Sequence, residues 1–251
     1  MLNKKNNFDD YSKYYDLLYK DKDYLGEVKN VIEILKKYNK SGKKILEYGC
    51  GTGIHAREFV KLGYKVHGID LSEKMISKIK PFDGFSFECG NICDLKVSSE
   101  FDFVISLFHV FSYQLKNENL KKIFCRASEH LISGGLFAFD FWYSPAVYSQ
   151  KPSIRIKRLT GSEVEIIRIA EPEIFSNKNQ IDVNYTIIER NKNDDSFYKF
   201  SEVHSMRHFS LPEIDFIANV HGFEIVEAHD LVTKNIPSED TWAIFVVLKK
   251  K

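Results

Sequence analysis

Several features that would place this chain in a specialised class are missing from its sequence. Lys and Arg (36) nearly balance Asp and Glu (35), so the net charge is only +1. A protein that neutralises nucleic-acid phosphates normally carries a clear basic excess. No apolar stretch is long enough to span a bilayer, and the polar first residues do not resemble a signal peptide. We therefore expect a cytoplasmic protein that binds neither nucleic acid nor membranes.

The cysteines provide no pattern typical of a metal site or a disulfide framework. Cys50, Cys89, Cys93 and Cys125 form no CxxC pair, and no Cys/His cluster has zinc spacing. The simplest interpretation is that they are reduced, packed thiols of a cytosolic protein. We expect no metal site.

Aromatic residues, in contrast, are abundant. They make up 14% of the chain, within an otherwise ordinary globular composition of 43% hydrophobic and 28% charged residues. A hydrophobic core accounts for the 20 Phe, but not for a cluster of tyrosines at the start of the chain. These are Tyr11, Tyr14, Tyr15, Tyr19 and Tyr24.

The hydrophobic pattern of residues 24–142 alternates between helix and strand. Helices are predicted at 24–38, 54–62 and 117–131, with a further one after a Ser72 cap, and strands at 44–48, 66–70, 85–89, 101–108 and 136–142. The strands at 101–108 and 136–142 are apolar almost throughout. Such strands are buried on both faces, which indicates a mostly parallel sheet covered by helices.

The pattern changes after Trp142. Residues 154–209 hold several alternating runs joined by short turns, which predicts an antiparallel sheet. Residues 210–213 then read as a capping box that starts a helix ending at Gly222, and strands at 223–228 and 241–248 close the chain. We predict one α/β domain over 1–251, with core segments 40–142 and 210–249 and an antiparallel insertion at 150–209.

A glycine-rich turn, Glu47-Tyr48-Gly49-Cys50-Gly51-Thr52-Gly53, joins the first predicted strand to a helix. Glycines permit tight backbone conformations and let a ligand approach closely. The dinucleotide fingerprint G-x-G-x-x-G fails because residue 54 is Ile54, and the Gly-Lys-Ser/Thr of a Walker A loop is missing. The turn fits the pattern acidic-x-G-x-G-x-G instead.

Because residues 47–53 look like their first motif, the chain resembles the class I S-adenosylmethionine-dependent methyltransferases. Asp70 looks like the acidic residue that binds the ribose hydroxyls, residues 90–94 like the adenine-binding segment, 101–106 like the fourth motif, and 131–136 like the turn before the fifth strand. Asn91 stands where the family usually has Asp. The resemblance implies a Rossmann-like sheet of seven strands and S-adenosyl-L-methionine as cofactor. The implied cofactor-binding residues are Tyr15, Tyr19, Tyr24, Glu47, Gly49, Cys50, Gly51, Gly53, Asp70, Leu71, Met75, Asn91, Ile92 and Leu107.

Further segments are similar to a narrower group, the N-methyltransferases and N,N-dimethyltransferases of nucleotide-linked amino sugars. They are residues 11–24, 50–55, 141–145 and 202–209, together with the antiparallel insertion. The resemblance implies N-methylation of such a sugar. Methylation of another small acceptor, on O or N, such as an amino acid or a phosphorylated glycan precursor, is the alternative. A non-catalytic cofactor-binding subunit is a third hypothesis, which the intact cofactor motifs count against.

The tyrosines at the start of the chain suit a lid over the cofactor. Aromatic faces attract cations, and the sulfonium of S-adenosylmethionine is cationic. We expect lid helices within 1–38, with Tyr15 and Tyr19 covering the cofactor and Tyr24 closing the pocket. Plain packing of an amphipathic helix is the alternative for each of them.

The acceptor side is expected at the carboxyl ends of the parallel strands, where open α/β sheets bind ligands. His109 and Tyr113 follow one such strand. We assign catalytic roles to them and to Tyr15. The predicted substrate-binding residues are Trp142, Tyr143, His204 and Arg207, with Arg207 suited to a bidentate phosphate contact. A solvated or sheet-paired position is the alternative for His204 and Arg207. Exposed strand edges in the insertion suggest a homodimer.

Overall fold

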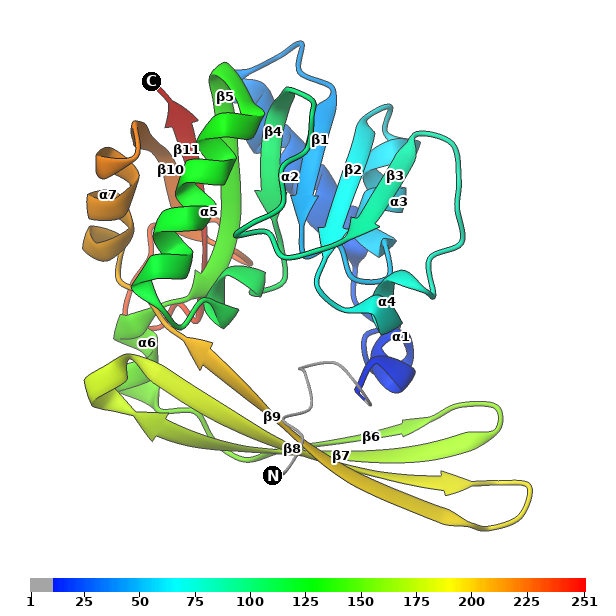
Figure 1. The fold of residues 1–251 in the computed structure, drawn as a ribbon. Helices are drawn as coiled ribbons and strands as arrows, with labels where there is room; N and C mark the ends of the chain where they lie inside the picture. Colours follow the sequence, from blue (N-terminus) through cyan, green and yellow to red (C-terminus); the bar gives the residue numbers. More distant parts are fainter. Residues whose placement is uncertain (1–10) are drawn as a thin grey trace.

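The computed structural model describes residues 11–251, which form a larger sheet and a smaller sheet that lies across the ends of its strands (Figure 1). Residues 1–10, which include the start of the predicted lid and the segment compared with a signal peptide, lie outside the described residues. The larger sheet has seven strands. They are β1 (Lys44–Tyr48), β2 (Lys65–Asp70), β3 (Phe85–Cys89), β4 (Phe101–Ser106), β5 (Leu131–Trp142), β10 (Phe223–Asp230) and β11 (Ala243–Lys250).

The strand order is β10-β11-β5-β4-β1-β2-β3. Strands β1 to β5 pair in parallel, whereas β11 runs antiparallel to both β5 and β10. This confirms the mostly parallel sheet of seven strands predicted from the sequence. Parallel pairing requires crossovers, and the intervening helices supply them.

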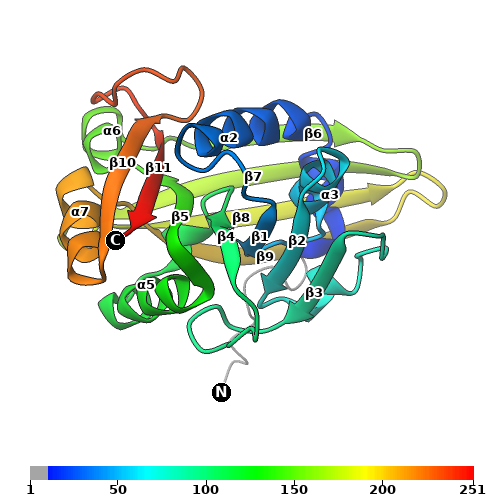
Figure 2. The same cartoon turned by 90° about the horizontal axis from the view of Figure 1, so that it is seen from above.

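Helices cover both faces of this sheet (Figure 2). On one face lie α2 (Tyr24–Tyr38) and α3 (Ile54–Lys61), and on the other α5 (Asn117–His130) and α7 (Leu211–Val220). Neighbouring side chains of β4 point to opposite faces, so Phe103 packs with the α2 and α3 residues and Val104 with those of α5 and α7. Both side chains are fully buried. This double burial is why β4 is apolar along its length.

The antiparallel sheet lies opposite the carboxyl ends of the parallel strands (Figure 1). Its four strands are β6 (Arg155–Thr160), β7 (Val164–Phe175), β8 (Gln180–Asn191) and β9 (Phe197–Arg207), in that order. A short 3-10 helix, η3 (Ser176–Lys178), joins β7 to β8. A bridge between Tyr143 and Phe209 ties the end of β9 back to the larger sheet.

Strand β5 begins at Leu131, directly after α5, so residues 131–136, expected as a turn before a strand at 136–142, are part of the strand. Four further local expectations differ from the structure. Strand β4 ends at Ser106 because Phe108 and His109 take left-handed φ values of 66° and 62°, and the 3-10 helix η2 (Val110–Tyr113) follows. Helix α4 (Glu73–Ile76) is capped by the predicted Ser72 but stops after a single turn. Helix α6 (Ser144–Gln150) was not predicted.

The predicted capping box before α7 is the fourth difference. Ser210 stands at the N-cap position, but its side chain makes no capping hydrogen bond. Glu213, the other half of the expected box, pairs with Arg207 instead. Within residues 11–251, no helix has the length and apolar character needed to cross a membrane.

Candidate active site

A cavity of about 1190 Å³ lies where the carboxyl ends of the parallel strands meet the antiparallel sheet. The turn after β1, the ends of β2, β4 and β5, the inward face of the insertion and the N-terminal tyrosines all contribute to its walls. This size and position suit a cofactor with a small acceptor beside it.

The glycine turn and Asp70 form one wall. Gly49, Gly51 and Gly53 have left-handed φ values of 75°, 55° and 77°, which glycine adopts without a steric penalty. The Gly51 N–H donates to Asp70 Oδ2 and the Ser72 N–H to Oδ1, each at 2.8 Å. Burial raises the pKa of Asp70, and these two hydrogen bonds oppose that shift. The carboxylate is therefore held rigidly against the turn.

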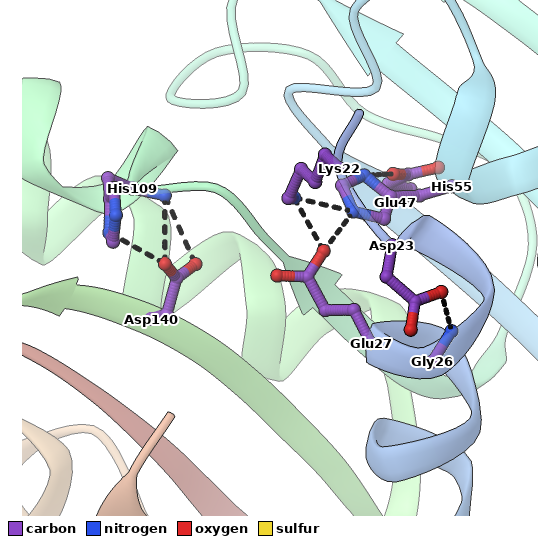
Figure 3. A network of polar contacts seen from close by, with 8 residues as sticks. All are labelled: Lys22, Asp23, Gly26, Glu27, Glu47, His55, His109 and Asp140. Atoms are coloured by element: carbon purple, nitrogen blue, oxygen red, sulfur yellow. Dashed lines mark hydrogen bonds and ion pairs between the residues drawn. The ribbon is translucent and has the colours of Figure 1, made fainter. Parts of the chain in front are cut away.

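Behind this wall, a buried network connects the glycine turn to the start of α2 (Figure 3). Glu27 Oε2 accepts from Lys22 Nζ at 2.5 Å and lies 2.6 Å from His55 Nε2. Burial alone would raise the pKa of Glu27, but the hydrogen bonds from His55 and Lys22 lower it to about 2. His55 Nδ1 lies 3.9 Å from Glu47 Oε1, so the network ends on the first residue of the turn motif.

Glu47 is itself an unusual carboxylate. It is only 1% exposed, and its Oε2 has no hydrogen-bond partner among the described residues. Burial, with a smaller effect from Asp70, raises its pKa to about 8. Ionising a buried carboxylate whose Oε2 lacks a hydrogen-bond partner is costly, so Glu47 favours its protonated form near neutrality.

Aromatic side chains from the N-terminal segment cover the cavity. They come from η1 (Tyr11–Tyr14), α1 (Tyr15–Leu18) and the first residue of α2. Tyr15 and Tyr19 pack with their ring centroids 4.9 Å apart, and Tyr19 meets Phe108 edge-on at 4.8 Å. Tyr24 contacts His55, with 4.9 Å between centroids. These rings form an aromatic cover over the mouth of the glycine turn.

His109 and Asp140 form an acid–base pair at the ends of β4 and β5 (Figure 3). The backbone N–H of His109 donates to both carboxylate oxygens of Asp140, at 3.1 and 3.0 Å. The ring Nδ1 lies 2.7 Å from Oδ2, an ion-pair distance whose alignment falls short of a regular hydrogen bond. The Asp140 side chain is fully buried, whereas His109 is 23% exposed and lines the cavity. Asp140 can therefore orient the imidazole toward the cavity.

A second polar chain crosses from η2 to the insertion. Tyr113 OH lies 2.8 Å from His204 Nδ1, and His204 Nε2 lies 3.1 Å from Glu202 Oε1. The other Glu202 oxygen accepts from the Tyr11 N–H at 3.1 Å. Burial raises the pKa of Tyr113 well above its usual range, so its hydroxyl stays protonated and can donate. This chain joins the acceptor end of the cavity to the N-terminal segment.

Comparisons with known proteins agree with this geometry. Residues 45–135 match the model of a family described as a methyltransferase domain. An amino-sugar enzyme of Streptomyces venezuelae, dTDP-3-amino-3,4,6-trideoxy-alpha-D-glucopyranose N,N-dimethyltransferase, is 25% identical over 220 residues, which cover 86% of this chain and 91% of that protein.

Two solved structures share the fold along nearly the whole chain. One is DesVI of Streptomyces venezuelae, with a TM-score of 0.81 at 21% identity, covering 96% of this chain and 98% of that one. The other is CalS10, an amino pentose methyltransferase from Micromonospora echinaspora solved with S-adenosylmethionine bound, with a TM-score of 0.77 at 17% identity, covering 98% and 99%.

The chain is a class I S-adenosylmethionine-dependent methyltransferase.

The cavity of this methyltransferase has the open space and the hydrogen-bond acceptors that its cofactor needs. A Cβ at Gly51 would meet only the Met75 methyl, at 3.5 Å, and would otherwise project into the cavity. Each Asp70 oxygen uses one lone pair on a backbone N–H and keeps another for a hydroxyl. The structure therefore fits a ribose at Asp70 and a cofactor chain along the glycine turn. When bound, S-adenosylmethionine supplies an electrophilic methyl group on a cationic sulfur.

Most of the residues predicted for the site line the methyltransferase's cavity. On the cofactor side they are Tyr15, Tyr19, Tyr24, Gly49, Cys50, Gly51, Asp70, Leu71, Met75, Asn91, Ile92 and Leu107, and on the acceptor side His109, Tyr113, Trp142 and His204. Their individual contacts with cofactor or acceptor stay predictions.

Four predicted residues lie outside the cavity lining. Glu47 and Gly53 lie behind the wall, Gly53 as the N-cap of α3. Tyr143 packs against the core beneath α7. Arg207 is directed away from the cavity, because Glu213 forms an ion pair with it and Asn117 Oδ1 accepts from it at 2.7 Å. Its predicted phosphate contact is therefore not what the structure presents.

The cavity also contains residues that the sequence prediction left out. Tyr11 and Phe108 join the aromatic cover, and Arg168 and Tyr185 enter from β7 and β8. Strand alternation was the available signal for the last two, since Arg168 shares a face with the buried Ile166 and Ala170. A charged residue at an inward-facing position of a strand indicates a functional site.

Proposed function

We propose that this methyltransferase transfers a methyl group to the amino nitrogen of a nucleotide-linked amino sugar. The observation that carries the proposal is the similarity to a dTDP-amino-sugar N,N-dimethyltransferase over 91% of that protein's length. The alignment is long enough to include the insertion as well as the cofactor domain. In this chain the insertion contributes Arg168, Tyr185, His204 and Met206 to the cavity.

The chemistry requires a neutral amine held in line with the methyl group. Most of the rate enhancement in such a displacement comes from holding donor and acceptor close and aligned. In this proposal His109, oriented by Asp140, accepts the proton that the amine loses, and the aromatic cover lies over the reacting groups. Tyr113 lies at the same end and donates or accepts a hydrogen bond through its hydroxyl.

The same acid–base pair favours a second candidate, methylation of a hydroxyl group on a small acceptor. A hydroxyl is a poor nucleophile until a base removes its proton, and a buried carboxylate behind an imidazole is the arrangement that such a step needs. The balanced charge of the chain, +1 overall, favours a small acceptor over a nucleic acid for either reaction.

A screen with isotope-labelled S-adenosylmethionine tests the proposal. Purified protein is incubated with dTDP-linked amino sugars, with their hydroxyl counterparts and with free amino acids, and products are identified by mass spectrometry. Methyl transfer to the sugar nitrogen is the expected result. Transfer to hydroxyl acceptors alone would favour the second candidate. Transfer only to amino acids would contradict a nucleotide-linked sugar as the methyl acceptor.

A further inference from the structure

Arg168 is a cation built into the cavity without a carboxylate to neutralise it. It lies on β7, and strand alternation directs it inward with Ile166 and Ala170. Its Nη1 donates to Tyr11 OH at 3.1 Å and contacts Tyr19 OH at 3.5 Å. The guanidinium lies over the Tyr185 ring, 5.4 Å from its centroid.

These contacts orient the guanidinium but leave its charge uncompensated. Its hydrogen-bond partners are neutral hydroxyls, and within residues 11–251 no acidic side chain forms an ion pair with it. Its Nε is buried and has no hydrogen-bond partner there. Burying a cation in this way is costly unless an anion completes the site.

A second positive charge lies beside the first. Lys157 is directly opposite Arg168 across the β6–β7 ladder. Its ammonium donates to the Leu18 carbonyl and lies 6.0 Å from the Tyr19 ring centroid. The insertion thus carries Arg168 in the cavity lining with Lys157 on the neighbouring strand, and the nearby carboxylate of Glu202 is paired with His204.

We propose that Arg168 binds an oxyanion of the methyl acceptor, a phosphate or a carboxylate, through the Nη groups of its guanidinium. The guanidinium offers a planar set of donors that matches two oxygens of such a group. The hydroxyls of Tyr11 and Tyr19 can donate to the same oxyanion. The identity of the acceptor rests on the proposed function, in which the anion is the diphosphate of a sugar nucleotide.

The two arginines of the acceptor region differ in this respect. Arg207 is already paired with Glu213, so an anionic ligand would have to compete with that carboxylate. Arg168 keeps its full charge and points into the cavity. The phosphate contact that the sequence suggested for Arg207 is therefore assigned to Arg168.

Binding measurements on three variants test this assignment. R168M removes the charge and keeps an apolar stem, R168K keeps the charge without the planar donors, and R158M alters an exposed arginine of neighbouring strand β6 as a control. Calorimetry in the presence of S-adenosylhomocysteine measures the affinity for thymidine diphosphate, inorganic pyrophosphate and a panel of α-amino acids. Affinity for S-adenosylhomocysteine itself is measured first, as a readout of folding and of the cofactor site.

We expect R168M to weaken thymidine diphosphate binding by about tenfold to a hundredfold, the usual effect of losing charged hydrogen bonds. R168K should lose less, and R158M should bind like the unaltered protein. If R168M loses affinity for amino acids only, Arg168 binds a carboxylate. That result would support the oxyanion site and would contradict only the proposal that the acceptor is nucleotide-linked.

Three results would overturn the proposal itself. The first is equal affinity of R168M and the unaltered protein for every anion. The second is an unaltered protein that binds none of these anions. The third is a matching loss of S-adenosylhomocysteine affinity in R168M, which would make Arg168 a structural residue.

Discussion

His109 and Asp140 are the two side chains to which we assign the proposed proton transfer. His109→Gln preserves a polar side chain but removes the basic ring. For an amine acceptor we expect kcat to fall by about a hundredfold, the lower end of the contribution typical of a general base. For a hydroxyl acceptor the loss should approach about 10⁴-fold. Single-turnover kinetics measure this step directly.

A matched control for this variant is Tyr143→Phe, since Tyr143 lies outside the cavity lining. It should leave kcat unchanged. An unaltered kcat in His109→Gln, with normal S-adenosylhomocysteine binding, would remove His109 from the mechanism.

Glu47 should make the stability of the cofactor-free protein depend on pH. Folding raises its pKa from 4.5 to about 8, so the folded state holds its proton more tightly than the unfolded state. The stability linked to this group is complete below pH 4.5 and is lost as the pH rises through 8. Glutamine cannot ionise and avoids the loss.

The Tm of Glu47→Gln relative to the unaltered protein should therefore rise between pH 4.5 and pH 9, by several degrees. Scanning calorimetry of the two proteins at matched pH measures the difference. The low pKa of Glu27 affects both proteins alike and cancels in the comparison. A difference that stays constant or shrinks with increasing pH would contradict the burial of an unpaired carboxylate.

Among the secondary elements, the aromatic cover makes a specific prediction about charge. If the face of Tyr15 stabilises a sulfonium, Tyr15→Leu should weaken S-adenosylmethionine binding about 2- to 30-fold while neutral S-adenosylhomocysteine is less affected. Tyr15→Phe keeps the ring and should keep the discrimination. At Tyr19, substitution by Leu or Phe also removes a hydroxyl that lies 3.2 Å from the Tyr11 hydroxyl, within hydrogen-bond distance. An equal loss of affinity for S-adenosylmethionine and S-adenosylhomocysteine would mean that these rings only pack against the cofactor and do not stabilise its charge.

The regular elements were predictable because local patterns determine them. The boundaries of α2, β1 and β3 were predicted to the residue, and the glycine turn lies between β1 and α3 as expected. The end of β4 was not predictable, because Phe108 and His109 adopt left-handed φ without being glycine. His109 is held there by hydrogen bonds to Asp140, 31 residues further along the chain, and no local pattern reveals such an anchor.

At the scale of the whole molecule, the site is assembled from segments far apart in sequence. The sequence suggested Arg207 for an acceptor phosphate, whereas our proposal assigns that contact to Arg168, because Glu213 of α7 is paired with Arg207. Cofactor-side residues were easier to predict, since they cluster in contiguous motifs. The acceptor side has no comparable motif, and its members come from η1, η2 and the insertion strands.

The homodimer stays a prediction. Strands β6 and β9 are the two edges of the antiparallel sheet, where a second copy could add its own strand. Light scattering coupled to size exclusion should give about twice the 29.2 kDa of one chain. A mass of one chain at all concentrations would contradict it.

The aromatic cover spans both ends of the cavity, and this has a consequence for the order of product release. Tyr24 packs on His55 beside the glycine turn, while Tyr11 contacts His204 and Arg168 on the acceptor side. If Tyr11 and Tyr24 move together as one cover, the departure of spent cofactor uncovers the acceptor as well. An amine that receives two methyl groups should therefore receive them in separate encounters, and the monomethylated amine should accumulate early in a time course and exchange with added acceptor. Formation of only the dimethylated product from the outset would show that the two ends open independently.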